Sequence, residues 1–523
     1  MSKQLLKSTS IVGGMTLVSR VSGLIRDIIF AQFLGAGILA DAFLVAFRIP
    51  NFLRRIFAEG AFSVAFIPVF TDIRQIGTHK EQQQFVGLMA GRLGLILMIL
   101  TALGVLFAPQ VVQVLAYGWS DDPRKIAITV DTVRLTFPYL LCISLVSMSA
   151  GILNTCSRFA AAAVTPIFLN LFLISAVLWF VPWFENAAIA LGFGVFLAGF
   201  FQLLFQLPFL LQVGYLPKPA LRSKSTAARK SVTKVFQLML PALFGSSIAQ
   251  INILVNTILA SFLVTGSVSW LYYSDRLMEF PLGVFGIALA TAILPGLSRQ
   301  YTDNDTIGFN QTLNTAIKWV CVVCIPAAVA LAVLAKPLLI TMFFYRQFNQ
   351  TDVYMSANAL VAYSFGLLGF VFVKVLAPGY FARQNTLTPV KIGATSVGVN
   401  IILSLALVST FEHVGLAIAT SIAAFVNAGL LGFYLRKDKV LHILSGLGRV
   451  IVSVCVASLI MAVVLWYSVG QIEIWFEYNA LRRIGSLSIT ILAGFLSYVL
   501  TLILLGLRLH HVLSNNETVD KKH

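Results

Sequence analysis

Residues 41–63 read DAFLVAFRIPNFLRRIFAEGAFS, an apolar stretch interrupted by five charged side chains. At 100° per residue, four of these charges fall within about 40° of one another on one helix face: Asp41, Arg48, Arg55 and Glu59. Arg54 flanks this stripe. We therefore expect residues 37–70 to form one membrane-spanning helix with a single polar stripe, which Pro50 is positioned to kink.

The composition of the whole chain places this stretch in a membrane protein. Of 523 residues, 58% are hydrophobic and only 11% are charged. One span needs about 20 apolar residues, so the chain could supply up to about 15 spans. These values exclude a soluble enzyme, a nucleic-acid-binding protein and a single-pass receptor. The net charge of +17 is assigned instead to cytoplasmic loops, and we expect no nucleic acid as a partner.

Apolar stretches bounded by loop signals predict fourteen transmembrane helices, and hence an all-α polytopic membrane protein. The expected spans are 8–34, 37–70, 85–108, 127–153, 159–181, 187–213, 235–264, 267–298, 310–342, 353–380, 386–410, 413–435, 446–469 and 484–508.

The distribution of Lys and Arg predicts the orientation of these helices. With the N-terminus inside, the inside segments carry 21 basic residues and the outside segments carry five. The five outside are Arg124, Lys125, Arg346, Arg482 and Arg483. Because cytoplasmic loops carry the excess of Lys and Arg, both termini are expected in the cytoplasm.

An internal repeat divides the chain. Two motif pairs recur six spans apart: Arg48 with Pro68 against Arg276 with Pro295, and Arg158 with Pro166 against Arg383 with Pro389. Six is even, so both halves enter the membrane from the same side and form two parallel six-helix repeats around a central cavity. The expected parts are an N-lobe at 1–214 (helices 1–6), a basic cytoplasmic linker at 215–234, a C-lobe at 235–436 (helices 7–12), helices 13 and 14 at 437–510, and a cytoplasmic tail at 511–523.

Charges inside the expected spans mark a candidate binding site. An ion at the bilayer centre costs at least about 2.5 to 3.5 kcal/mol, so its presence there calls for a function. Seven cations and five anions qualify: Arg20, Arg26, Arg48, Arg54, Arg55, Arg276 and Lys374, with Asp27, Asp41, Glu59, Asp275 and Glu279. Arg276 and Glu279 are three residues apart on a helix and close enough to pair. Salt bridges that only hold helices together are the alternative interpretation.

The excess of arginine favours an anionic ligand. The planar guanidinium binds phosphate or carboxylate in a bidentate manner, and a pyrophosphate fits this description. The chain has no phosphate-binding loop of the G-x-x-x-x-G-K-[ST] type and no soluble segment long enough for an ATPase domain. Transport driven by ion gradients, the membrane potential or the substrate gradient is therefore expected, with no cofactor and no metal.

Three segments carry a resemblance to a known family. The run from Asp41 to Ser63, with Arg20 to Asp27 before it, closely resembles the MurJ (MviN) family of bacterial lipid II flippases. The segments 269–281 (SWLYYSDRLMEFP) and 374–380 (KVLAPGY) resemble it too. This family belongs to the multidrug/oligosaccharidyl-lipid/polysaccharide exporter superfamily, and the resemblance covers essentially the whole chain.

The resemblance implies a cargo and its binding residues. The cargo would be undecaprenyl-pyrophosphate-linked MurNAc-pentapeptide-GlcNAc, moved from the inner to the outer leaflet of the cytoplasmic membrane. The positions that matter in the family match Arg20, Arg26, Arg54, Arg55, Arg276 and Asp41. Helices 13 and 14 would form a groove for the polyprenyl tail. Lipid II, membrane lipids and the cell-wall synthesis machinery are the implied partners.

Three other functions remain open from the sequence. A flippase for a different polyprenyl-linked saccharide would use the same architecture. A drug/cation antiporter of the same superfamily would share the duplication, but it would favour an acidic or aromatic cavity. A membrane scaffold for cell-wall enzymes would tolerate the loss of intramembrane charges.

Overall fold

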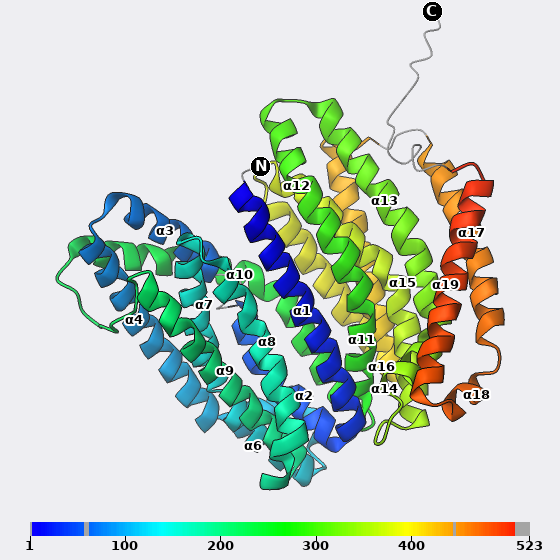
Figure 1. The fold of residues 1–523 in the computed structure, drawn as a ribbon, viewed down its shortest axis with the longest axis horizontal. Helices are drawn as coiled ribbons and strands as arrows, with labels where there is room; N and C mark the ends of the chain where they lie inside the picture. Colours follow the sequence, from blue (N-terminus) through cyan, green and yellow to red (C-terminus); the bar gives the residue numbers. More distant parts are fainter. Residues whose placement is uncertain (1–2, 57–61, 443–445, 508–523) are drawn as a thin grey trace, which may run out of the picture. The chain divides into compact units, whose positions relative to one another are not determined.

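The computed structural model describes residues 3–56, 62–442 and 446–507, and every regular element in these ranges is a helix (Figure 1). The helices pack into two compact units, Met1–Ser269 and Trp270–His523. This all-helical architecture is the one that an apolar phase demands, because each backbone N–H and C=O must find its partner inside the chain.

Unit 1 contains the first ten α-helices. They are α1 (Lys3–Leu34), α2 (Ile38–Leu53), α3 (Phe62–Ile76), α4 (His79–Leu106), α5 (Ala108–Leu115), α6 (Pro123–Thr136), α7 (Tyr139–Thr155), α8 (Phe159–Ser175), α9 (Ala187–Gln212) and α10 (Thr226–Ser261), with the short turns η2 (Tyr117–Trp119), η3 (Ala176–Phe180) and η4 (Val181–Trp183). In this unit α1 packs along α8, and α10 packs against α3 and α4.

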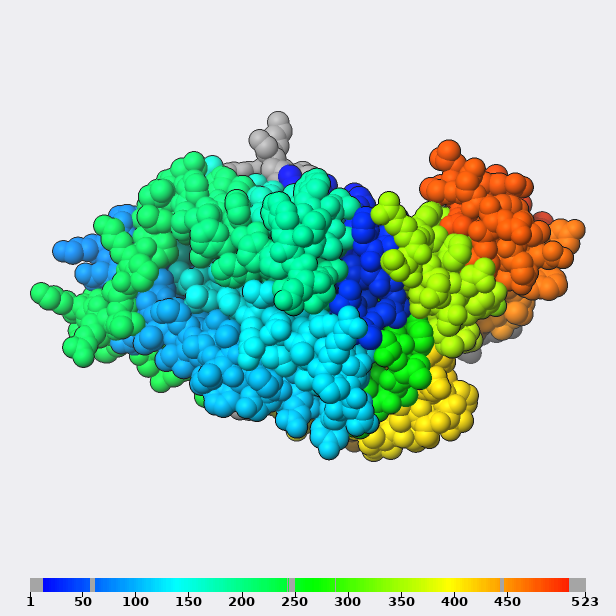
Figure 2. Space-filling model, turned by 90° about the horizontal axis from the view of Figure 1, so that it is seen from below, coloured from blue at the N-terminus to red at the C-terminus, as the bar shows by residue number. Residues whose placement is uncertain are grey.

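Unit 2 contains the remaining helices. They are α11 (Ser267–Pro281), α12 (Ile287–Thr302), α13 (Thr306–Val333), α14 (Ala335–Phe343), α15 (Gln350–Phe381), α16 (Leu387–Lys437), α17 (Leu447–Val469), α18 (Ile472–Glu477) and α19 (Ala480–Leu504), with the π-turn η5 (Leu282–Gly286). The first three residues of α11 belong to unit 1. The helices α17 and α19 pack on one another, in orange and red in Figure 2.

Ten helical segments in the described ranges are long and apolar enough to cross a membrane. One of them, α16, spans 51 residues and bends at Glu412, where the backbone leaves helical geometry at φ 50° and ψ −131°. This bend falls between the expected spans 386–410 and 413–435. In the described residues, the other three expected spans, 8–34, 37–70 and 235–264, are mostly helical too, but charged or polar residues interrupt their apolar runs.

The segment 37–70 is not one helix. The helix α2 contains Pro50 and ends at Leu53, a π-turn covers residues 54–56, and α3 begins at Phe62. Proline has no backbone N–H and its ring disturbs the preceding turn. This explains why the α-helical hydrogen bonds of α2 give way to a π-turn shortly after Pro50. Glu59 lies outside the described residues, so its place on the predicted stripe is untested.

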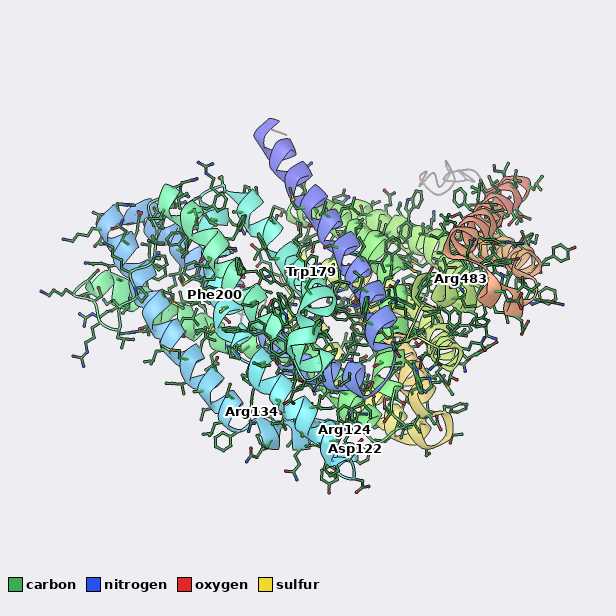
Figure 3. The ribbon with its side chains drawn as sticks, turned by 60° about the horizontal axis from the view of Figure 1, so that its bottom comes forward. Asp122, Arg124, Arg134, Trp179, Phe200 and Arg483 are labelled. Carbon is green, nitrogen blue, oxygen red and sulfur yellow. The ribbon has the colours of Figure 1, made fainter. Side chains whose placement is uncertain are left out.

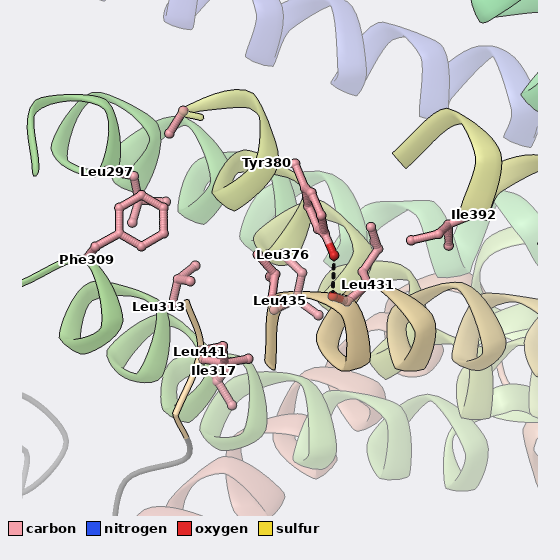
Figure 4. Packing of buried hydrophobic residues seen from close by; sticks show 11 residues of the cluster. Leu297, Phe309, Leu313, Ile317, Leu376, Tyr380, Ile392, Leu431, Leu435 and Leu441 are labelled. Carbon is pink, nitrogen blue, oxygen red and sulfur yellow. Dashed lines mark hydrogen bonds between the residues drawn. The ribbon is translucent and has the colours of Figure 1, made fainter. Parts of the chain in front are cut away.

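The core of unit 2 consists of apolar side chains from several helices packed against one another. In unit 2, Tyr380 of α15 is fully buried, and its hydroxyl donates a 2.6 Å hydrogen bond to the carbonyl of Leu431 on α16 (Figure 4). Leucines from α12, α13 and α16 surround this bond. Trp270 and Tyr273 of α11 are buried, and the indole of Trp270 donates to the carboxylate of Asp352 at 2.9 Å.

A buried arginine anchors the last hairpin of unit 2. Arg483, labelled in Figure 3, lies in the first turn of α19 and donates to the carbonyls of Trp475, Phe476 and Phe344 at 3.1, 2.9 and 2.8 Å. These carbonyls belong to α18 and to the end of α14. The fork of five donors on arginine thereby satisfies helix-end acceptors that have no partner within their own helices.

The segment between α9 and α10 is exposed or partly exposed over much of its length and contacts α4 through Tyr215 and Ala220. The amide of Ala220 donates to the carbonyl of Gly87 at 3.0 Å, and a Cβ added at Gly91 would overlap the Ala220 backbone. The buried hydroxyl of Tyr215 donates to Gln82 on α4 at 2.6 Å. Burial raises the pKa of Tyr215, so the phenol stays a neutral donor.

The close approach at Gly91 can be tested by adding one methyl group. We expect Gly91→Ala to lower the free energy of unfolding by about 1 to 3 kcal/mol, because the new Cβ forces backbone apart. Gly94, on the same helix, has nothing within 4 Å of its added Cβ. Gly94→Ala should therefore be neutral or stabilising by about 0.5 to 1 kcal/mol. Thermal unfolding of the purified variants measures both, and equal melting temperatures would contradict the docked linker.

Candidate functional site

Asp41 is the centre of a fully buried charge cluster in unit 1. Its carboxylate lies 3.1 Å from the ammonium of Lys125, and both residues are 1% exposed. The same carboxylate accepts hydrogen bonds from the Gly266 amide at 2.8 Å, the Ser269 amide at 3.1 Å and the Ser269 hydroxyl at 2.6 Å. Asp41 therefore caps the N-terminus of α11, where the helix dipole favours negative charge.

Lys125 is positioned by the start of α6. Asp122 caps this helix by accepting from the Lys125 amide at 3.0 Å, and Pro123 occupies its first position. Figure 3 shows Asp122 beside Arg124 at this end of the helix. The Lys125 ammonium also lies 3.9 Å from the ring centroid of Trp119 and 3.3 Å from the Thr265 hydroxyl. The buried ammonium thus contacts a carboxylate, a hydroxyl group and an aromatic ring, which together compensate for its removal from water.

Lys125 was placed in an outside loop by the sequence and was missed as a partner for Asp41. The Asp122-Pro123 cap signal predicts that a helix begins here, so Lys125 occupies its first turn. A cation in the first turn opposes the helix dipole, and this is a signal that it serves an interaction elsewhere. The partner, 84 positions away, cannot be read from local spacing.

Arg26 and Asp27, adjacent on α1, form a second buried pair, which contacts α8 through Asn170. The guanidinium of Arg26 donates to Asp27 at 2.7 and 3.0 Å and to the side-chain oxygen of Asn170 at 2.9 Å. The amide of Asn170 in turn donates to Ser22 at 2.8 Å. Both charges are satisfied within the protein, so this pair joins the two helices in the described arrangement.

The other predicted arginines of unit 1 are less enclosed. Arg20 is exposed, whereas Arg48, Arg54 and Arg55 are partly buried. Arg54 donates to the side-chain oxygen of Asn51 at 2.8 and 3.1 Å. This bond holds the guanidinium across the π-turn that ends α2.

In unit 2, α11 carries the predicted charges of the eighth span. Arg276 pairs with Glu279 at 2.7 Å, which confirms the expected i, i+3 contact, and its guanidinium lies 5.0 Å from the ring centroid of Tyr272. Arg276 is 32% exposed and therefore remains accessible to a ligand. Asp275 is partly buried on the same helix, and Lys374 on α15 is exposed.

The charges fall into two chemical groups. The first group consists of two buried ion pairs, Asp41 with Lys125 and Arg26 with Asp27, which stabilise the packing of the helices. Arg20, Arg276 and Lys374 keep access to solvent in this structure. The cations of the second group can bind the oxygens of an incoming anion in place of water or a carboxylate. This exchange costs less free energy than breaking one of the buried pairs.

Comparisons with known proteins bear on this arrangement. The family model described as Lipid II flippase MurJ matches residues 30–505. A probable lipid II flippase MurJ from Haemophilus influenzae is 42% identical over 515 residues, which cover 96% of this chain and 100% of the relative. The lipid II flippase MurJ of Burkholderia cenocepacia is 37% identical over 475 residues, covering 90% of each chain.

Solved structures agree with this result. The structure described as lipid II flippase MurJ, inward closed conformation, matches with a TM-score of 0.78 at 26% identity and covers 94% of this chain and 98% of its own. A multidrug resistance MATE family transporter of the MOP superfamily matches with a TM-score of 0.68 at 14% identity, covering 82% and 96%. At that identity the second match shows a shared fold only.

The Lys125–Asp41 pair yields a stability prediction. Lys125→Met leaves a buried carboxylate without its cation, and we expect a loss of about 3 to 5 kcal/mol. Adding Asp41→Asn to this variant removes the stranded charge and should recover part of the loss. The exposed pair Lys234–Asp72, 3.7 Å apart, provides the control, because Lys234→Met should cost less than about 1 kcal/mol. Equal melting temperatures for Lys125→Met and Lys234→Met would refute the role of the buried pair.

Proposed function

We propose a transport mechanism for this chain on one premise: it belongs to the MurJ family and is a lipid II flippase, a multi-pass protein of the inner membrane. The undecaprenyl-pyrophosphate-linked MurNAc-pentapeptide-GlcNAc moves from the inner to the outer leaflet by alternating access through a cationic cavity. The observation that carries this proposal is the set of accessible arginines on helices otherwise built for an apolar phase.

The membrane arrangement in this proposal has fourteen spans. Ten candidate spans lie in the described residues, and α16 counts as two because it bends at Glu412. Three more spans are assigned to 8–34 with α1, to 37–70 with α2 and the start of α3, and to 235–264 with α10. The lobes 1–214 and 235–436 are the two parallel repeats, and both termini lie in the cytoplasm. The excess of basic residues on the inside segments supports this orientation.

The pyrophosphate binds to arginine in this mechanism. Arg20, Arg48, Arg54 and Arg55 in the N-lobe, with Arg276 and Lys374 in the C-lobe, supply the positive charge. Arg26, Asp27, Asp275, Glu279 and the undescribed Glu59 orient these groups or neutralise them when the site is empty. The guanidinium fork matches the phosphate oxygens, and desolvation of both partners strengthens the bond.

Asp41 acts as a lock between the predicted lobes. By the boundaries above, Asp41 and Lys125 belong to the N-lobe, whereas Gly266 and Ser269 belong to the C-lobe. Gly266 and Ser269 make three contacts with the Asp41 carboxylate, near the outside ends of the expected spans. In this mechanism, opening of the cavity to the outside breaks these three contacts and closing restores them, whereas the Asp41–Lys125 pair stays within the N-lobe.

The drug/cation antiporter is the less supported alternative. A cationic drug needs an accessible carboxylate that is not already paired. Asp41 and Asp27 are 1% and 2% exposed and bound to cations, and the more exposed Glu279 is paired with Arg276. Resistance to cationic dyes on overexpression, dependent on Asp41 or Asp275, would favour the antiporter. A flippase for another polyprenyl-linked saccharide differs only in its cargo, which the same transport experiment distinguishes.

Loss of the accessible arginines should abolish transport without removing the protein. In a host depleted of the native flippase, we expect Arg20→Ala or Arg276→Ala to leave the lipid-linked precursor protected from an externally added phosphodiesterase. Arg134→Ala is the matched control, because Arg134 is exposed and pairs with Asp131, three residues before it, at 3.1 Å. Immunoblots of membrane fractions report protein amount. Wild-type cleavage in both cavity variants would defeat the proposal.

A further inference from the structure

A polar groove lies between α4 and α10 in unit 1, apart from the residues assigned to transport. Its volume is about 580 Å³, within the range of small-ligand sites. Every lining residue is polar, three are cations and none is acidic: Arg92, Thr226, Arg229, Lys230, Thr233 and Gln237. Such a lining offers positive charge, hydroxyl groups and an amide, which together suit a phosphate group.

The docked linker shapes this groove. The linker crosses α4 at Gly87 and then leads directly into α10, so the first turns of α10 are held beside α4. The two helices run in the same direction. Their beginnings are joined through Ala220 and Gly87, and their far ends are close because the amide of Gly118, which follows α5, donates to the hydroxyl of Ser261 at the end of α10 at 3.1 Å. Arg92 on α4 and the two cations Arg229 and Lys230 on α10 therefore lie at a similar height along the common direction of the two helices.

Immediately beyond the groove, both helices expose apolar side chains. On α4 these follow Arg92 and are Leu95, Ile96, Met98 and Ile99, and on α10 they follow Gln237 and are Leu238 and Leu240. Polar surface thus gives way to apolar surface at the same level on both helices. This is the pattern expected where a membrane protein passes from the headgroup layer to the hydrocarbon core.

We propose that this groove binds the headgroup of an anionic phospholipid. The phosphate is held by Arg92, Arg229 and Lys230, and its acyl chains lie on the apolar surface beyond. The positive lining suits any phosphate, but the apolar surface next to it favours a lipid, because a soluble phosphate has no apolar chains to place there. The site is distinct from the cavity arginines, and the proposal rests only on the membrane-spanning character of the chain.

The test measures the thermal stability of the purified full chain in a neutral detergent. Dioctanoyl-phosphatidylglycerol should raise the melting temperature saturably, and dioctanoyl-phosphatidylcholine should not. In the double variant Arg229→Gln/Lys230→Gln, we expect the midpoint of this titration to rise at least tenfold. Both side chains are exposed, so the variant removes charge without disturbing a core.

A charge-matched variant separates a site from general attraction. Lys218→Gln/Arg222→Gln removes two exposed linker cations that do not line the groove, and its midpoint should stay within twofold of the wild type. An equal loss in both variants would overturn the site, as would an unchanged midpoint in Arg229→Gln/Lys230→Gln. The same saturable shift with glycerol 3-phosphate would overturn the lipid assignment. Precursor cleavage by external phosphodiesterase is scored separately, so a failure here differs from a failure of the transport mechanism.

Discussion

Charge inside an apolar phase is the constraint on which this structure depends. An ion there must find a partner or reach water, and the chain uses both solutions. Lys125 with Asp41, and Arg26 with Asp27 and Asn170, are complete networks that hold helices together. Arg483 finds three backbone carbonyls instead of a carboxylate. Arg20 and Arg276 instead keep access to solvent, and Arg276 does so while it pairs with Glu279.

The sequence predicts the parts of this protein that depend on local patterns. Helical segments follow from apolar runs, and the contact of Arg276 with Glu279 follows from a spacing of three residues. Pairing across 84 positions leaves no such trace, so the partner of Asp41 was missed. The composition of the linker shows its basic charges, whereas the contact of its backbone with Gly87 and Gly91 on α4 depends on packing and cannot be read from the composition.

The fold alone does not choose the cargo. A transporter of the MATE family shares this architecture at 14% identity, so function has to be argued from the site and not from the scaffold. In this chain Asp27 and Asp41 are buried, whereas Arg20 is exposed and Arg276 is partly exposed. The selection of an anion that we propose therefore depends on side-chain burial. A sequence motif reports the residue types, and the packing decides which of them are available.

The single peptide bond that joins the two compact units, between Ser269 and Trp270, lies inside the helix α11 and not in a loop. A continuous helix behaves as a stiff rod, and seven residues separate Ser269 from Arg276, a rise of about 10 Å. The first turn of this rod is held by Asp41, and its middle carries an arginine that faces solvent. The turn that Asp41 caps and the turn that carries Arg276 therefore belong to one ladder of backbone hydrogen bonds, and a change of backbone direction between them would have to break that ladder.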